Sequence, residues 1–88
     1  MTSKQLNHKI RQVNKILGYP LKAYEMTKDF KAKANVNTYY IGKAYGGYRI
    51  EQICNEGGGC RDISDRGTKR ECYIFASGML EALRSVNR

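Results

Sequence analysis

Basic side chains at two places in the chain have the types and spacing that bind phosphate. The segment Arg66-Gly67-Thr68-Lys69-Arg70 puts a capping hydroxyl and three basic groups at the predicted start of a helix. Unpaired N–H groups and the helix dipole favour an anion at such a start. The alternative is an ordinary cap with solubilising charges, because the order Gly-Thr-Lys departs from the phosphate-binding loop motif.

The second basic group lies near the N-terminus. Four basic side chains share one side of a predicted helix, opposite its apolar stripe: Lys4, His8, Arg11 and Lys15. No acidic residue lies in this helix, although like charges at helical spacing are mildly destabilising. The face is either a basic surface that is only solvated, or one that follows phosphates or docks on an acidic protein.

Tyrosines form another candidate contact surface. The chain has seven tyrosines and two phenylalanines, and four of the tyrosines surround one glycine pair: Tyr39, Tyr40, Tyr45 and Tyr48. Tyrosine can stack on nucleic-acid bases or anchor a protein interface. Half-burial in a small sheet is the simpler explanation.

The cysteines, the histidine and the acids of the sequence give little support for a metal site or a catalytic site. Cys54, Cys60 and Cys72 are separated by five and eleven residues and lack the C-x₂-C pair typical of zinc sites, and His8 is distant. A Cys54–Cys60 disulfide is conceivable but needs an oxidising compartment. Four acids near these cysteines could converge, but we expect them to balance nearby arginines: Glu51, Glu56, Asp62 and Asp65. We predict no catalytic residue, no metal and no cofactor.

Two amphipathic helices are predicted at the ends of the chain. The first is capped by Thr2 with Gln5, ends near Leu17 before Gly18, and has apolar residues at helical spacing: Leu6, Ile10, Val13 and Leu17. The second begins at a capping box formed by Thr68 and Glu71. Its predicted apolar face comprises Cys72, Phe75, Ala76, Met79, Leu83 and Val86, flanked by Leu80 and Ala82.

The central third predicts a hairpin. Residues 38–45 and 48–54 are rich in β-formers, and Gly46-Gly47 between them favours a type I′ turn. That turn would place Tyr45 opposite Tyr48, Lys43 opposite Ile50, Ile41 opposite Gln52 and Tyr39 opposite Cys54. We expect Tyr39, Ile41 and Ile50 to face the core, and Arg49 and Glu51 to face water.

Shorter strands are expected at residues 20–26, 30–34 and 60–63. The run Gly57-Gly58-Gly59 carries a large conformational entropy cost. It suggests a wide turn whose backbone is approached closely, either by another chain segment or by a bound anion; simple flexibility of the loop is the third explanation.

The elements and composition together predict one α+β domain over residues 1–88. We expect a helix, a three- to four-stranded antiparallel meander and a second helix, with both helices on one face of the sheet. The net charge is +8, and residues 1–33 hold eight basic and two acidic residues. Such a balance favours an anionic partner. The sequence has no apolar run long enough for a membrane span and no secretion signal, and its odd cysteine count fits a reducing cytosol.

The central residues carry a family resemblance. Ala44-Tyr45-Gly46-Gly47-Tyr48, Gln52, Asn55, the three glycines and Asp62-Ile63 resemble a pattern shared by small uncharacterised proteins of phages and prophages. The resemblance implies a bacterial host cytoplasm and brings no known activity. We therefore predict a non-enzymatic accessory protein that binds nucleic-acid phosphates, with a protein-binding adaptor that docks on an acidic host or phage protein as the alternative.

Overall fold

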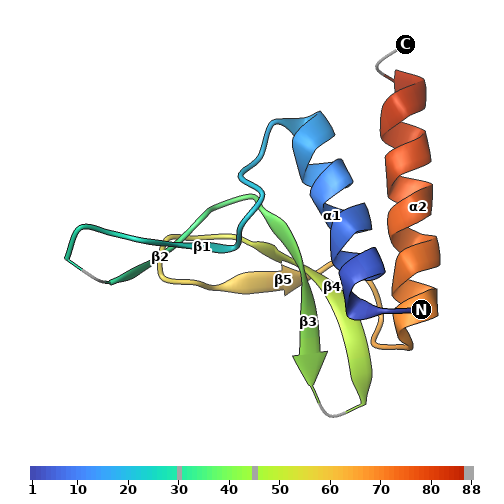
Figure 1. Cartoon of the computed structure of the whole chain (residues 1–88), viewed down its shortest axis with the longest axis horizontal. Coiled ribbons are helices and arrows are strands. Elements are labelled where there is room, and N and C mark those ends of the chain that lie inside the picture. The colour runs from blue at the N-terminus through green and yellow to red at the C-terminus, as the bar shows by residue number, and fades with distance from the viewer. Residues whose placement is uncertain (30, 45, 87–88) are drawn as a thin grey trace.

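The computed structural model describes residues 1–29, 31–44 and 46–86. The elements follow one another as α1 (Ser3–Leu17), β1 (Tyr24–Met26), β2 (Ala32–Ala34), β3 (Tyr39–Ala44), β4 (Gly47–Ile53), β5 (Cys60–Asp62) and α2 (Lys69–Val86). The chain is therefore α+β, and the predicted order of helix, antiparallel strands and helix is confirmed (Figure 1).

Both helices lie on one face of the three-stranded sheet β3-β4-β5. They rise side by side from the same end of the molecule, with α1 against β3 and α2 against β4 (Figure 1). Their shared core with the sheet is a cluster of five buried residues: Leu6, Ile10, Ile50, Cys72 and Ala76. Tyr39 and Ile41 pack against this cluster and Ile50 is fully buried, so all three face the core as predicted.

The buried stripe of α1 includes a polar residue that the pattern did not indicate. Leu6, Ile10 and Val13 are buried, whereas Leu17 is only half-buried. Asn14 is fully buried instead. Its Nδ2 donates to the Tyr39 carbonyl and its Oδ1 accepts from the Tyr39 N–H, each at 2.9 Å. This amide therefore fixes the start of β3 on α1, because a buried polar group needs hydrogen-bond partners.

The apolar face of α2 is narrower than predicted. The buried line runs through Cys72, Ala76 and Leu80. Phe75 and Val86, expected on the buried face, have 42% and 81% of their surface exposed. The reason is that α1 and the sheet cover only the side of α2 centred on the Cys72–Leu80 line.

The hairpin between β3 and β4 has a different register from the one predicted. Ile41 lies opposite Ile50, Lys43 opposite Tyr48 and Ala44 opposite Gly47. Each pair is thus shifted by two residues, and the connection consists of residues 45–46 rather than 46–47. The same residues keep the same faces, because a shift of two preserves the side-chain alternation. The predicted pairing of Tyr45 lies outside the described residues.

Contact with the segment before α2 explains why Gly47 belongs to the strand. Tyr48 and Gly67 exchange two backbone hydrogen bonds, of 2.7 and 2.8 Å. A Cβ on Gly47 would overlap the Gly67 carbonyl oxygen, and the φ of Gly47 is +118°. Gly47 therefore serves close backbone packing as well as the reversal of the chain.

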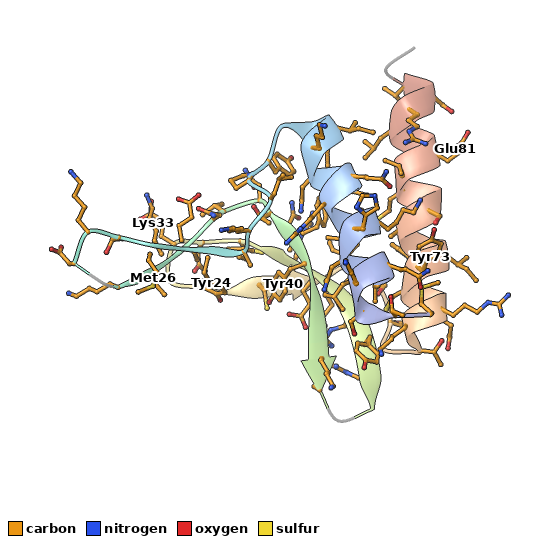
Figure 2. The ribbon with its side chains drawn as sticks, in the orientation of Figure 1. Tyr24, Met26, Lys33, Tyr40, Tyr73 and Glu81 are labelled. Carbon is orange, nitrogen blue, oxygen red and sulfur yellow. The ribbon has the colours of Figure 1, made fainter. Side chains whose placement is uncertain are left out.

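Strands β1 and β2 form a separate two-stranded sheet rather than part of one meander. They are shorter than predicted, and Phe30 lies outside the described residues. We call residues 24–29 and 31–34 the arm, since they project away from the helices (Figure 1). Figure 2 shows Met26 and Lys33 on this projection. The base of the arm is fixed by hydrogen bonds from the Asn35 N–H to the Ala23 carbonyl and from the Asn35 side chain to the Lys22 carbonyl.

The triple-glycine loop is folded onto its own chain. The Gly58 N–H donates to the Asn55 carbonyl at 3.1 Å, and the Gly59 N–H donates to the Asn55 side chain at 3.0 Å. The Tyr24 hydroxyl would lie 3.2 Å from a Cβ on Gly58. A chain segment thus approaches this loop closely, in agreement with the first of the three explanations for the glycines.

Candidate functional site

Four basic side chains project from the exposed face of α1, and we call them the α1 ridge: Lys4, His8, Arg11 and Lys15. All four are exposed, opposite the buried side of the helix. The helix starts at the Thr2–Gln5 capping box and ends at Gly18, whose φ of +76° suits glycine. Lys15 lies in the last turn, where the helix dipole stabilises a positive charge.

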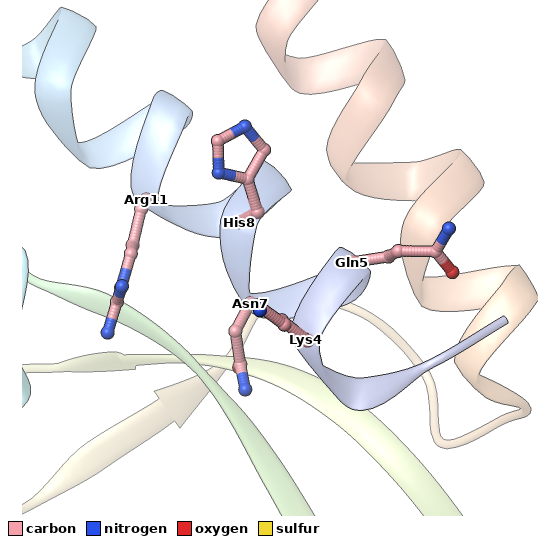
Figure 3. A pocket seen from close by; sticks show the side chains of 5 residues that line it. All are labelled: Lys4, Gln5, Asn7, His8 and Arg11. Atoms are coloured by element: carbon pink, nitrogen blue, oxygen red, sulfur yellow. The ribbon is translucent and has the colours of Figure 1, made fainter.

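The first half of the ridge borders a hollow of about 430 Å³. Figure 3 shows its five lining side chains spreading from the first turns of α1: Lys4, Gln5, Asn7, His8 and Arg11. Three of them are basic or imidazole groups and two are neutral amides. The hollow can therefore offer several hydrogen-bond donors to one anionic chain.

A second hollow, of about 420 Å³, continues the ridge past His8 and Arg11, which border both hollows. Lys15 borders it from α1 and Arg84 from α2, so we call it the Arg84 hollow. Its lining is completed by Gln12, Ile16 and Leu21, and the described residues that line it include no Asp or Glu.

Arg84 is the functional candidate that the sequence pattern missed. The pattern places it only on the polar side of the second helix, away from the apolar face. The parallel arrangement of the two helices brings the last turn of α2 beside Lys15, which lies in the last turn of α1. The direction of α2 relative to α1 is set by the intervening strands, so the helix patterns alone could not have indicated it.

The basic segment before α2 is largely engaged within the protein. Thr68 and Glu71 form the expected capping box: the Glu71 N–H donates to the Thr68 hydroxyl at 3.1 Å, and the Thr68 N–H donates to the Glu71 carboxylate at 3.2 Å. The Glu71 carboxylate therefore lies where a bound phosphate was predicted. This arrangement favours an ordinary helix cap over a phosphate site on the helix axis.

The neighbouring basic groups contact the hairpin. Arg66 donates to the Gly47 carbonyl at 3.2 Å, and the Lys69 ammonium lies 5.3 Å from the centre of the Tyr48 ring. Arg70 is exposed. Lys69 and Arg70 line a hollow of about 550 Å³ with Thr68, Glu71 and the Met1 end of the chain, and Arg66 does not border it. We call Arg66, Thr68, Lys69 and Arg70 the helix-end cluster.

The α1 ridge and the helix-end cluster are joined by a small hollow of about 170 Å³. It shares Asn7 with the hollow at the ridge and Tyr48 with the hollow at the helix-end cluster. Lys43 adds a further positive charge there. Apart from Arg66, the sequence-predicted cations therefore border one series of adjoining hollows, although they do not meet in a single pocket.

The tyrosines do not form one patch. Tyr39 and Tyr40 border a hollow of about 290 Å³ together with Arg11 and Lys22. Tyr48 packs on the core and borders the hollows near the helix-end cluster. Tyr45 lies outside the described residues. The three described tyrosines are half-buried and occur at two separate places.

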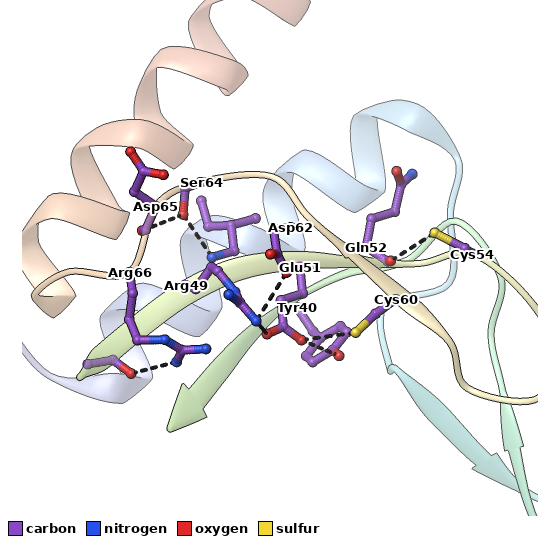
Figure 4. A network of polar contacts seen from close by, with 12 residues as sticks. Tyr40, Arg49, Glu51, Gln52, Cys54, Cys60, Asp62, Ser64, Asp65 and Arg66 are labelled. Carbon is purple, nitrogen blue, oxygen red and sulfur yellow. Dashed lines mark hydrogen bonds and ion pairs between the residues drawn. The ribbon is translucent and has the colours of Figure 1, made fainter. Parts of the chain in front are cut away.

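On the sheet face opposite the helices lies a polar network around Glu51, shown in Figure 4. Glu51 was expected to face water, but it is only 8% exposed. Its carboxylate accepts hydrogen bonds from the Tyr40 hydroxyl at 2.6 Å, Arg49 at 2.9 Å and the Cys60 thiol at 3.4 Å. Gly42 makes room for it, since a Cβ there would lie 2.5 Å from the Glu51 Oε1 atom.

The network holds Glu51 charged. Burial acts to raise the pKa of Glu51, but the hydrogen bonds from Tyr40, Arg49 and Cys60 and the charge of Arg49 outweigh it and lower the pKa. Burial, with the neighbouring Cys60 and Glu51, raises the pKa of Tyr40. Arg49 also pairs with Asp62 at 3.1 Å. The positive charge of Arg49 therefore faces the negative charges of Glu51 and Asp62. Such a network of paired charges stabilises the fold rather than forming a reactive site.

The remaining acids and cysteines lie apart. Arg61 donates to the Gln52 side chain at 2.8 Å rather than to an acid. Cys54 and Cys60 are free and exposed, and Cys72 is free and buried. Burial raises the pKa of the Cys72 thiol. Among the described residues no group of three or more His, Cys, Asp or Glu could hold a metal ion.

Comparisons with known proteins found no match among family models, curated proteins or solved structures. None of the helices in the described part of the chain is both long and apolar enough to cross a membrane. The hollows along α1 and the charges around them are therefore the features from which a function can be inferred.

Proposed function

We propose that this chain is a non-enzymatic accessory protein that binds nucleic acid through its phosphates along the α1 ridge. The observation that carries the proposal is the Arg84 hollow. There Arg84 of α2 joins His8, Arg11 and Lys15 of α1, and the described lining includes no acid. Cations that gather without acidic partners attract a polyanion and release its counterions on binding.

The length of the ridge suits a phosphate chain. Lys4 and Lys15 are eleven residues apart, so they span about 16 Å of helix. One strand of B-DNA presents about five phosphates over that axial length. Each exposed lysine or arginine of the ridge can therefore meet a different phosphate, and such contacts position a nucleic acid without reading its sequence.

The proposal predicts a salt-dependent affinity that falls with each ridge cation removed. Fluorescence anisotropy with labelled duplex DNA, RNA and single strands should show log K falling linearly with log salt concentration. Arg11→Gln and Lys15→Gln should each reduce that slope by about 0.7–0.9, because each removes one phosphate contact. No binding to any of these nucleic acids at about 50 mM salt would contradict the proposal.

Lys33→Gln provides a matched control, since Lys33 is an exposed lysine on the arm (Figure 2). It removes the same charge from the whole protein but no contact of the ridge, so the slope should stay at the native value. A slope that falls equally in the control would indicate a response to net charge alone.

A protein-binding adaptor is the second candidate, and the exposed side of α2 favours it. Ile74 and Phe75 are 61% and 42% exposed, and Val86 at the far end of the helix is more exposed still. A contiguous exposed apolar patch marks an interaction surface, and Ile74 and Phe75 are adjacent in the helix. In this proposal the apolar side of α2 and the nearby basic groups dock together on an acidic host or phage protein.

The two functions are separable by one pair of variants. Ile74→Ser should weaken capture of a protein partner from nuclease-treated bacterial lysate and leave nucleic-acid affinity unchanged. Arg11→Gln should have the reverse effect if nucleic acid is the partner. Loss of protein capture only in Arg11→Gln would identify the ridge as the protein-docking surface and contradict the nucleic-acid proposal.

The proposal also places the protein in the cytoplasm of a bacterial host. Its support is the resemblance of residues 44–63 to phage and prophage proteins, together with three free cysteines. Thiol labelling in intact bacteria that express the chain should find the exposed Cys54 and Cys60 reduced. Finding them oxidised would place the protein outside the reducing cytosol.

A further inference from the structure

The Arg84 hollow concentrates more positive charge than a single backbone phosphate neutralises. Arg11, Lys15 and Arg84 carry three permanent charges around a volume of about 420 Å³. The two ion pairs among the described residues both belong to Arg49, on the opposite face of the sheet. The ends of the two helices stabilise Lys15 and Arg84 individually, but an internal phosphodiester supplies only one negative charge to all three.

The lining of the hollow also has an apolar part. Ile16 and Leu21 border it beside the cations, and Leu21 is 48% exposed. The volume falls within the range of small-molecule sites, about 300–1,000 Å³. A ligand that fits this lining has a strongly anionic group and, next to it, a flat or apolar group of modest size.

We infer that the Arg84 hollow binds the terminal phosphomonoester of a nucleic-acid strand, with the end nucleoside against Ile16 and Leu21. A phosphomonoester carries about −1.5 to −2 charges at pH 7 and has three acceptor oxygens, so it matches three cations better than a phosphodiester does. Arginines from two helices can reach such a group from two sides, and their planar donors suit phosphate oxygens. This inference depends on the proposed function and adds to it a preference for strand ends.

The test compares single strands of one sequence that differ only at the 5′ end. Each strand carries its fluorophore at the 3′ end, and anisotropy measures the affinity of the whole protein. A 5′-phosphorylated strand should bind about tenfold more tightly than its 5′-hydroxyl counterpart, because it gains charge-assisted hydrogen bonds. Strands labelled at the 5′ end, with and without a 3′ phosphate, show whether either end is accepted.

Variants connect the preference to the hollow. Arg84→Gln should reduce the ratio of the two affinities to about one, and Arg84→Lys should retain part of it, because lysine keeps the charge but loses the planar pair of donors. Lys33→Gln on the arm should leave the ratio unchanged. Arg84 is exposed, so the Gln variant should keep its fold, which circular dichroism checks.

Competition separates the two sources of the same ligand chemistry. Displacement of the 5′-phosphorylated strand by a free nucleoside monophosphate supports recognition of the phosphomonoester together with its nucleoside. If inorganic phosphate displaces the strand equally well, Ile16 and Leu21 do not contribute to binding. If a terminal phosphate raises the affinity of the native protein at neither the 5′ end nor the 3′ end, the inference is overturned while the proposed function stands. If no strand binds, the proposed function fails. If the free mononucleotide binds although no strand does, and if Arg84→Gln abolishes that binding, the hollow is a mononucleotide site and the inference about strand ends is overturned.

Discussion

At the scale of single residues, Glu51 shows how a small domain accommodates a buried carboxylate that stays ionised. Its carboxylate is shielded from water by the sheet but receives three side-chain hydrogen bonds, and the missing side chain of Gly42 leaves it space. A buried polar network is stabilising only when its members are satisfied. Tyr40, Arg49 and Cys60 meet that condition here, although alternation alone placed Glu51 in water.

Glu51→Gln should therefore destabilise the fold by about 1–3 kcal/mol at pH 7. The folded-state pKa of Glu51 lies below its unfolded value, so this stabilisation is fully present above the unfolded pKa of about 4.3 and is lost as the pH falls through the folded pKa. Urea unfolding of the native protein and the variant should give free energies of unfolding that converge as the pH falls from about 4.3 through the lower folded-state pKa of Glu51.

The comparison is controlled by Glu25→Gln, on the exposed strand β1. That change should alter the free energy of unfolding by no more than about 0.5 kcal/mol at any pH. A difference between native protein and Glu51→Gln that stays constant down to pH 2 would mean that the charge of Glu51 does not contribute.

At the scale of elements, the β3–β4 hairpin depends on a contact beyond its own turn. The bridge between Tyr48 and Gly67 joins β4 to the segment that leads into α2, and Arg66 donates to the Gly47 carbonyl. Gly47 is therefore required by its neighbour Gly67 as well as by its φ. A prediction made from the sequences of the two strands could not include the contact with Gly67. The predicted register of β3 against β4 was wrong by two residues for this reason.

Gly47→Ala should destabilise the protein by roughly 2–4 kcal/mol, because the new Cβ meets the Gly67 carbonyl and the φ of +118° is strained for alanine. Gly18→Ala is the matched control: its φ is also positive, but no atom lies within 4 Å of the added Cβ. The control should cost only about 1–2 kcal/mol. Equal losses in thermal or urea unfolding would show that the φ alone matters.

The sequence predicted what depends on local pattern and missed what depends on packing. Both capping boxes, both helices and the core positions of Leu6, Ile10 and Cys72 follow from spacing. The burial of Asn14 does not, because its partner is the backbone of Tyr39, 25 residues away. The α1 ridge was visible in the helical pattern, whereas Arg84 entered the site only through the parallel packing of α2 on α1.

At the scale of the whole molecule, the charge is divided between two sides of the sheet. The helix side carries the ridge and its hollows, while both ion pairs of the described residues lie on the other side, at Arg49. Acids thus neutralise the face that the helices leave uncovered. If the partner is anionic, it is expected to approach along the α1 ridge, where the hollows are lined by cations and by no described acid, since such a field raises the rate of productive encounter.

The amide protons of the arm are expected to be replaced by deuterium faster than those of the helix–sheet body. Its two strands of three residues are exposed except at Ala34, and they share no ladder with the sheet beneath the helices. Opening of the arm costs few buried contacts, so amides such as Glu25, which lies at a hydrogen-bonded position opposite Lys33, should lose protection without global unfolding. Ile50 should exchange only near the full free energy of unfolding. Proteases, too, are expected to cut first in the arm and to leave the helix–sheet body intact.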